Sequence, residues 1–376
     1  MAEHTGADRR RLLTLFEQLV SFDSPSFGER EICDFLKEKL SDLGLTVQED
    51  DTAEKISGSC GNLFGQLAGT LDLPPLLFCA HMDTVEPSRG KRMQTDDTGK
   101  ITSGGNTVLG ADDCSGLAAI LEALAVIQET GLPHRPIEIL FCPAEETYGD
   151  GSRHFDYSRL HSKEAYVLDL TGPVGAAAYQ APMILSFTAT FWGRAAHAGF
   201  APENGIHAIK AAALALSRTP CGRIDDTTTV NIGIISGGTQ TNIVPEQCTL
   251  SGEIRSLSDD GALVQLVLIS HIMEEAANEL GATVEFQHTI HIHAYRTDPS
   301  HPVVKRFETA CSSLGLPLSL EQTFGGSDNN HIAQHGISGI VIANAMNACH
   351  SCEEYTTEEE LERIANLTLT LMLSKE

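Results

Sequence analysis

The sequence predicts an α/β fold in which a mostly parallel sheet forms one domain and a smaller α+β domain is inserted into it. In the first 180 residues, uniformly apolar runs suited to strands buried on both faces alternate with helical segments. From about Met183 the pattern changes to strict alternation of apolar and polar residues, which is typical of half-exposed strands. Past about Arg296 the first pattern returns. A chain of 376 residues also exceeds the length at which one core usually stops growing.

Two amphipathic helices are expected first, because apolar residues recur at helical spacing over residues 12–20 and 32–43, and Gly44 is placed to end the second helix. The strand candidates that follow are PLLFCAH, IEILFCPA and AYVLDL, with the helical segment SGLAAILEALAVIQ between the first two. Strands that alternate with helices predict a largely parallel sheet.

The inserted part is expected to form a compact unit whose sheet faces solvent on one side. Its elements are a strand over 185–191, a helix over 205–218, strands over 227–238 and 248–256, a helix over 259–280 and a strand over 282–295. After it come a helix over 302–314, the loop FGGSDNN, the strand GIVIAN and a last helix that opens at a capping box, Thr357-x-x-Glu360. We therefore place the inserted domain at residues 181–294 and the two parts of the larger domain at 1–180 and 295–376.

Charge and composition exclude several classes of partner. The formal net charge is −26, from 51 Asp and Glu against 25 Lys and Arg, and such a field repels phosphate backbones and anionic lipid headgroups. We therefore expect neither nucleic acid nor membrane as a partner. The start of the chain lacks an apolar core like that of a signal peptide, and no segment approaches the roughly 18 apolar residues of a membrane span. A soluble, cytoplasmic protein is expected.

The ten cysteines are expected to be reduced, because most lie inside apolar strand or helix patterns and a chain of this length needs no disulfide staples. Cys349 and Cys352 form a CxxC pair, but no second pair accompanies them to complete a four-cysteine zinc site.

Acidic and imidazole side chains follow the apolar runs directly. They are His81 and Asp83 after PLLFCA, Glu145 and Glu146 after IEILFCPA, Asp169 after AYVL, His350 shortly after GIVIAN, and Asp112 and Asp113 just before a helix. In open α/β sheets, ligands bind beyond the carboxyl ends of the strands. These side chains are therefore expected to converge on one polar cluster.

Imidazole and carboxylate ligands without thiolate suit zinc, and also cobalt or manganese, better than an iron–sulfur cluster or copper(I). Zinc is the leading choice. A pair of ions about 3.5–4 Å apart needs roughly two ligands each and a shared carboxylate, which matches the number of side chains present. The spacing His81-x-Asp83 makes sense if the aspartate accepts the other N–H of the histidine and so fixes its tautomer.

Eight motifs carry a family resemblance: AHMDTV, GADDCSG, PAEETYGDG, VLDL, GRAAHAGFAPENG, GGTQTNIVPE, GGSDNN and the late His350. In order and spacing they resemble the dizinc peptidases of the M20 family, most closely the peptidase T (tripeptide aminopeptidase) branch. The resemblance covers nearly the whole chain. It implies a zinc-peptidase catalytic domain with an inserted lid that mediates homodimerisation, and a short peptide as substrate.

The resemblance also implies a role for each site residue. The first Zn²⁺ would be held by His81 and Asp169 and the second by Glu146 and His350, with Asp112 bridging both and Asp83 orienting His81. Glu145 would be the general base. Asp113 is expected to be a helix-start or orienting acid rather than a ligand.

Three residues of the lid match positions that contact substrate in relatives. His197 matches a histidine that reaches the partner subunit's active site and stabilises the oxyanion, and Asn242 and Arg255 match contacts to the substrate or its terminal carboxylate. The alternative is that none of the three contacts substrate: His197 would be an ordinary lid residue, Asn242 a turn residue and Arg255 a surface charge on a strand. The chain also departs from the family, with Cys114 and Ser115 where members often carry Lys, and a thiolate of the CxxC pair beside His350 could compete for metal.

The leading hypothesis is release of the N-terminal residue of tripeptides. An N-acyl amino acid deacylase or carboxypeptidase of the same superfamily is the alternative, although Asp169 stands where many of those relatives use Glu. A non-catalytic peptide-binding homologue is the third reading. It conflicts with the full set of polar groups at one strand edge, Glu145 included, because such groups are costly unless they are used.

Overall fold

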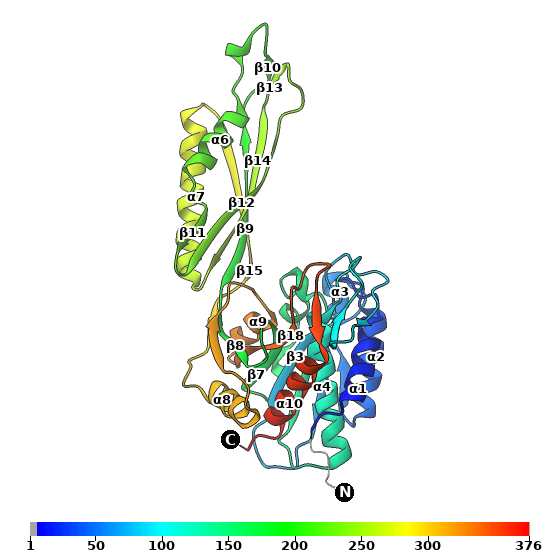
Figure 1. The fold of residues 1–376 in the computed structure, drawn as a ribbon. Coiled ribbons are helices and arrows are strands. Elements are labelled where there is room, and N and C mark those ends of the chain that lie inside the picture. The colour runs from blue at the N-terminus through cyan, green and yellow to red at the C-terminus, as the bar shows by residue number, and fades with distance from the viewer. Residues whose placement is uncertain (1–5, 376) are drawn as a thin grey trace. The chain divides into compact units, whose positions relative to one another are not determined.

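The structure, a computed structural model, describes residues 6–375, so the extreme ends of the expected larger domain lie outside the described residues. The chain forms two compact units, each with its own core (Figure 1). The large unit comprises Met1–Gln180, Arg296–Gln322 and Ser327–Glu376, and the small unit comprises Ala181–Tyr295 and Thr323–Gly326.

The large unit is built on a nine-stranded mixed sheet in the order β1-β2-β6-β3-β7-β18-β8-β16, with β17 beside β8. The four central strands β6, β3, β7 and β18 run parallel, whereas β1 and β2 pair antiparallel with their neighbours. Strand β8 pairs antiparallel with β18 and parallel with β17. The strands are β1 (Thr46–Glu49), β2 (Leu63–Leu67), β3 (Leu76–His81), β6 (Ile137–Cys142), β7 (Glu164–Thr171), β8 (Ala176–Ala181), β16 (Tyr295–Arg296), β17 (Ser319–Gln322) and β18 (Ser338–Met346). The predicted α/β class with a parallel central sheet is confirmed.

Helices cover both faces of this sheet. Alternate residues of β3 show the division: Phe78 belongs to the main core beneath α4, whereas the Cys79 thiol lies 3.8 Å from Asp328 Oδ2 at the start of α9. Helices α1 and α10 pack with α4, α8 packs with α10, and α5 packs with α9. The helices are α1 (Arg9–Val20), α2 (Arg30–Asp42), α3 (Thr52–Ile56), α4 (Ala111–Thr130), α5 (Asp150–Arg153), α8 (Pro302–Leu314), α9 (Asp328–Gln334) and α10 (Glu358–Met372), with short 3₁₀ turns η1 (Glu145–Thr147) and η2 (Tyr157–Arg159).

A small three-stranded sheet, β4 (Gln94–Thr95), β5 (Lys100–Thr102) and β19 (Tyr355–Thr357), precedes α10. Thr357 caps that helix by accepting the Glu360 N–H at 3.1 Å. The other half of the predicted capping box differs, because the Glu360 carboxylate accepts from the Thr357 hydroxyl and the Asn347 amide.

The small unit is a five-stranded antiparallel sheet in the order β11-β12-β14-β9-β15, with two helices packed against it. Along β9 the side chains alternate as predicted, and those of Leu185, Phe187, Ala189 and Phe191 are buried. The elements are β9 (Met183–Trp192), η3 (Pro202–Asn204), α6 (Ala208–Arg218), β11 (Gly222–Asp225), β12 (Thr228–Gly237), β14 (Gln247–Ser256), α7 (Asp259–Glu279) and β15 (Thr283–Ile292). A two-stranded ribbon, β10 (Ala196–His197) and β13 (Ile243–Val244), completes the unit.

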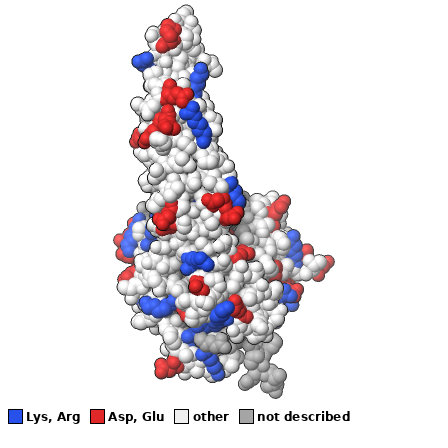
Figure 2. All heavy atoms as spheres, turned by 90° about the vertical axis from the view of Figure 1, so that its left-hand side faces the viewer, with Lys and Arg blue, Asp and Glu red and all other residues white. Residues whose placement is uncertain are grey.

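The surface carries acidic and basic side chains side by side. On the face shown in Figure 2, Lys and Arg are scattered among Asp and Glu and form no continuous basic surface. Within residues 6–375, no helix combines the length and the apolar character needed to cross a membrane.

Because each unit has its own core, truncating Phe191, which is fully buried in the small unit, should act locally. We expect Phe191→Ala to lower the free energy of unfolding of the small unit by about 3–5 kcal/mol, the usual cost of removing a buried ring. Native-state hydrogen exchange should then speed up in β9 and β14 and stay unchanged in β3 and β6. Equal acceleration in both units would show that they unfold together.

Candidate metal centre

The predicted site residues converge beyond the carboxyl ends of the central strands. His81 ends β3, Glu146 lies in η1 directly after β6, Asp169 lies near the end of β7, and His350 follows β18. Asp112 joins them from the start of α4. Their ligand atoms form two groups, each within 4.8 Å: His81, Asp112 and Asp169 in the first, and Asp112, Glu146 and His350 in the second.

Asp112 is common to both groups, and its two carboxylate oxygens face different imidazoles. Oδ1 lies 3.0 Å from Nε2 of His81, and Oδ2 lies 3.2 Å from Nε2 of His350. The remaining carboxylates stand beside the same nitrogens, with Asp169 Oδ1 at 4.0 Å from His81 Nε2 and Glu146 Oε1 at 3.1 Å from His350 Nε2. This is the arrangement that a carboxylate shared by two cations requires.

The tautomer of His81 follows from its other nitrogen. Nδ1 lies 2.9 Å from the backbone oxygen of Asp83, which can only accept, so Nδ1 carries a proton. In the neutral ring, Nε2 then turns a lone pair toward the lone pairs of Asp112 Oδ1. Two facing acceptors need a cation between them, either a proton or a metal ion.

The electrostatics of the cluster indicate the same need. Burial raises the pKa of Glu145 and Asp169 well above the usual range, and neighbouring carboxylates add to the rise. The facing carboxylates of Asp112 and then of Glu146 raise the pKa of His350 to about 10. For His81, burial opposes protonation, but the facing Asp112 and Asp83 carboxylates still raise its pKa. A negative field that holds protons so firmly would also hold divalent cations in their place.

Glu146 supplies a further sign of a missing partner. Its Oε1 is buried and makes no hydrogen bond, although His350 Nε2 lies 3.1 Å away. A buried carboxylate oxygen without a donor is costly. The residues present therefore fit a pair of metal ions.

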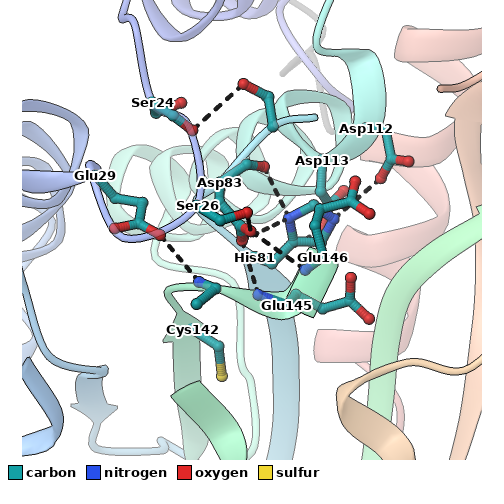
Figure 3. A network of polar contacts seen from close by, with 12 residues as sticks. Ser24, Ser26, Glu29, His81, Asp83, Asp112, Asp113, Cys142, Glu145 and Glu146 are labelled. Atoms are coloured by element: carbon teal, nitrogen blue, oxygen red, sulfur yellow. Dashed lines mark hydrogen bonds and ion pairs between the residues drawn. The ribbon is translucent and has the colours of Figure 1, made fainter. Parts of the chain in front are cut away.

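Asp83 fixes the loop that carries the two glutamates (Figure 3). Its Oδ1 accepts the Glu145 N–H at 2.9 Å, and its Oδ2 accepts the Glu146 N–H at 3.2 Å and the Ser26 hydroxyl at 2.7 Å. The same Oδ1 lies 3.4 Å from His81 Nδ1, which is farther than the Asp83 carbonyl oxygen. Asp83 thus orients His81 chiefly through its backbone, and its carboxylate is used mainly to hold Glu145 and Glu146.

Three further buried acids position the site, namely Glu354, Glu29 and Asp113. Sequence reasoning assigned no role to Glu354 or Glu29. Glu354 accepts the N–H groups of Gly110 and Asp112 at 2.7 and 2.9 Å. Glu29 accepts that of Ala144 at 3.0 Å, next to Glu145. The only signal for Glu354 was its place four residues after His350.

Asp113, expected to be an orienting acid, accepts the backbone N–H of His81 at 3.0 Å and that of Gly116 at 3.1 Å. The peptide between Asp112 and Asp113 is cis. Asp113 therefore turns away from the cluster toward the backbone, while Asp112 faces the two imidazoles.

The cysteines near His350 stay outside the cluster. Neither Cys349 nor Cys352 belongs to any of the candidate metal-binding groups found among residues 6–375. Burial raises the pKa of Cys349 to about 11, which keeps it a thiol at neutral pH. All ten cysteines are free, as expected.

In the small unit, the ribbon brings two of the predicted substrate residues together. His197 pairs with Ile243 across β10 and β13, and the neighbouring Ala198 N–H donates to the Asn242 carbonyl oxygen at 2.9 Å. Arg255 lies apart from them in β14. Its guanidinium donates to the Glu253 carboxylate at 2.6 Å and to the Phe324 carbonyl oxygen at 2.8 Å.

Replacing Glu354 by Gln should destabilise the protein, because an amide has one acceptor oxygen for two buried N–H donors. We expect the free energy of unfolding in urea to fall by about 1–3 kcal/mol. The matched control is Glu353→Gln, whose side chain is exposed and should change stability by no more than about 0.5 kcal/mol. Equal effects of the two substitutions would contradict a positioning role for Glu354.

Comparisons with known proteins identify the family of the chain. The sequence model of peptidase family M20/M25/M40 matches residues 77–374. An uncharacterised Bacillus subtilis protein, YqjE, is 38% identical over 97% of this chain and 98% of its own. The solved aminopeptidase PepT from Bacillus cereus is 38% identical, with a TM-score of 0.93 over 98% of each chain. A tripeptidase from Staphylococcus aureus is 33% identical, with a TM-score of 0.95 over 97% of this chain and 98% of that chain. The protein therefore belongs to peptidase family M20/M25/M40.

Proposed function

We propose that this protein is a metal-dependent aminopeptidase that releases the N-terminal residue of short peptides, tripeptides above all. The observation that carries the proposal is the pair of ligand groups joined by Asp112, with Glu145 held next to Glu146. The similarity to solved proteins named aminopeptidase and tripeptidase over nearly the whole chain supports the choice of substrate.

Two Zn²⁺ ions per chain are proposed, with Co²⁺ or Mn²⁺ as alternatives. His81 and Asp169 would hold one, Glu146 and His350 the other, and Asp112 would touch both. Bound there, such ions would polarise the scissile carbonyl and lower the pKa of a water molecule.

Glu145 is proposed as the general base. Its backbone is fixed by Asp83, and its side chain is in neither group joined by Asp112, although it lies within 4.8 Å of ligand atoms of His81 and Glu146. Burial, and after it the charge of Asp169, raises its pKa, which makes the carboxylate a stronger proton acceptor. It would take a proton from the attacking water and pass it to the leaving amine.

His197 is proposed to donate a hydrogen bond to the oxyanion in the active site of a partner copy. Its Nδ1 accepts the N–H groups of Gly199 and Phe200 at 3.1 and 3.2 Å, so Nε2 of the neutral ring carries the proton. The ribbon thus presents a donor rather than an acceptor, which is what an oxyanion needs.

Asn242 and Arg255 are proposed to contact the peptide or its C-terminal carboxylate. The bonds of Arg255 to Glu253 and Phe324 use three of its five N–H donors, and one N–H on each terminal nitrogen remains. The remaining pair would suit a carboxylate.

A homodimer through the small unit is proposed as the functional form. Helix α7 exposes Val264, Val267 and Leu268, which lie on one helix face and are 63%, 69% and 43% exposed. Strand β11 pairs only with the first residues of β12. The rest of β12, including the exposed Ile234 and Ile235, therefore has an open edge within the described chain. Apolar exposure of this kind is typical of an interface, and a second copy offers a matching surface.

We propose that the protein is located in the cytoplasm.

Replacing Glu145 by Gln should separate catalysis from metal binding. We expect kcat to fall by roughly 10²–10⁴, the usual contribution of a general base, with two metal ions per chain still found by elemental analysis. The matched variant Glu146→Gln should lose metal from one position. If instead Glu145→Gln loses metal and Glu146→Gln keeps it, the two roles are reversed.

Cleavage of a substrate with a blocked N-terminus distinguishes an aminopeptidase from the deacylase or carboxypeptidase alternative. An unmodified tripeptide should release its N-terminal residue, its N-acetylated form should be almost inert, and its C-terminal amide should lose about 1.5–3 kcal/mol in kcat/KM for one charged hydrogen bond. Product mass analysis identifies the bond cut. Cleavage of the acetylated peptide as fast as the free one would exclude the aminopeptidase.

The dimer can be tested with a charge in the middle of the α7 stripe. Light scattering of the unmodified protein should report twice the chain mass, and Val267→Asp should shift the mass toward one chain because it buries an unpaired carboxylate. Leu318→Asp, at an exposed apolar position of the large unit, is the control and should remain dimeric. A fully active monomer at micromolar concentration would contradict the proposal.

A further inference from the structure

Phe200 is the most exposed large apolar side chain in the described part of the chain, at 85%. Its ring nevertheless has a defined neighbour, because it stacks on the His197 imidazole with centroids 4.2 Å apart and planes inclined by 30°. Removing a phenyl ring from water is favourable, so leaving this ring exposed forgoes stabilisation that a bound partner could recover.

The loop around this ring is built to hold the two side chains together. The Gly199 and Phe200 N–H groups both donate to His197 Nδ1, and the Ala201 N–H donates to the His197 carbonyl oxygen at 3.1 Å. These bonds close a tight turn over residues 197–201, and the 3₁₀ turn η3 follows it directly. Phe200 therefore keeps its place beside the imidazole through its backbone as well as through its ring.

The position of the ring relative to Nε2 determines what it can touch. A substrate oxygen that accepts from His197 Nε2 would lie about 2.7–3.1 Å from that nitrogen. Since the phenyl ring lies against the same imidazole, a side chain flanking that carbonyl comes within contact distance of the ring. A neutral imidazole and a phenyl ring offer this side chain an apolar wall and no cation.

We propose that the Phe200 ring contacts the substrate side chain beside the scissile bond. This contact makes the enzyme prefer short peptides with an apolar residue at that position. The inference rests on the proposed peptidase function and on the role of His197 in it. It adds a determinant of the substrate class, because small or acidic side chains gain nothing from the ring.

The test uses the full-length, zinc-loaded protein and two series of tripeptides. One series varies the N-terminal residue among Leu, Ala and Asp, the other varies the second residue in the same way, and all other positions are Gly. Values of kcat/KM are measured for the unmodified protein, Phe200→Leu and Phe200→Ala. Trp192→Leu, which removes another exposed aromatic ring of the small unit, is the matched control.

In one of the two series, the preference for Leu over Ala should fall by about tenfold in Phe200→Ala, the lower end of the discrimination available to an apolar contact. Phe200→Leu should lie between, and Trp192→Leu should keep the full preference. The series that responds identifies which side of the scissile bond the ring contacts.

Unchanged preferences in both series would overturn the inference. So would a uniform fall in kcat for every peptide, because that result assigns Phe200 to holding His197 and not to reading substrate. If the unmodified protein cleaves none of the tripeptides, the proposed function itself is wrong, and the inference that rests on it is overturned as well. Circular dichroism and light scattering confirm that the variants remain folded and keep their oligomeric state.

Discussion

The large unit depends on one electrostatic constraint, which is the concentration of negative charge beyond its central strands. The Asp112 carboxylate stands between two imidazoles, and Asp169, Glu145 and Glu146 lie close by with little access to water. Without compensating cations, burial and mutual repulsion raise the pKa values of Glu145, Glu146 and Asp169 above their ordinary range. The parallel sheet makes the concentration unavoidable, because neighbouring strands end at the same edge.

A second set of buried acids is stabilised differently. Asp83, Asp113, Glu29 and Glu354 each accept at least two backbone N–H groups from segments at or near the cluster. Backbone donors carry partial charge and cannot move away, so each carboxylate fixes the backbone segments from which it accepts. The two sets share one edge of the sheet: one faces inward to the peptide backbone, and the other faces the place where cations would bind.

The sequence predicted the part of this arrangement that follows from strand direction. His81, Glu146 and Asp169 follow apolar runs, and the rule for strand ends is enough to bring them together. It did not predict Glu29 or the hydrogen bonds of Glu354, because their partners are backbone N–H groups whose direction depends on the path of each loop. Strand β8 was also missed, since Ala176–Ala181 contains no β-branched residue and becomes a strand only beside β18. The hydrogen-bond partners of Arg255 were not predicted either, because one of them is the carbonyl oxygen of Phe324, which lies far along the chain.

The chain leaves the large sheet at the end of β8 and returns to it at β16, and these two strands are neighbours in that sheet. The two ends of the insertion are therefore close in space, and a short turn could join them directly. An inserted segment with adjacent ends can be lengthened, shortened or exchanged during evolution without rearranging the strands of its host. The residues proposed to bind cations and those proposed to contact substrate can thus diverge at different rates, which offers one ligand cluster a route to many specificities.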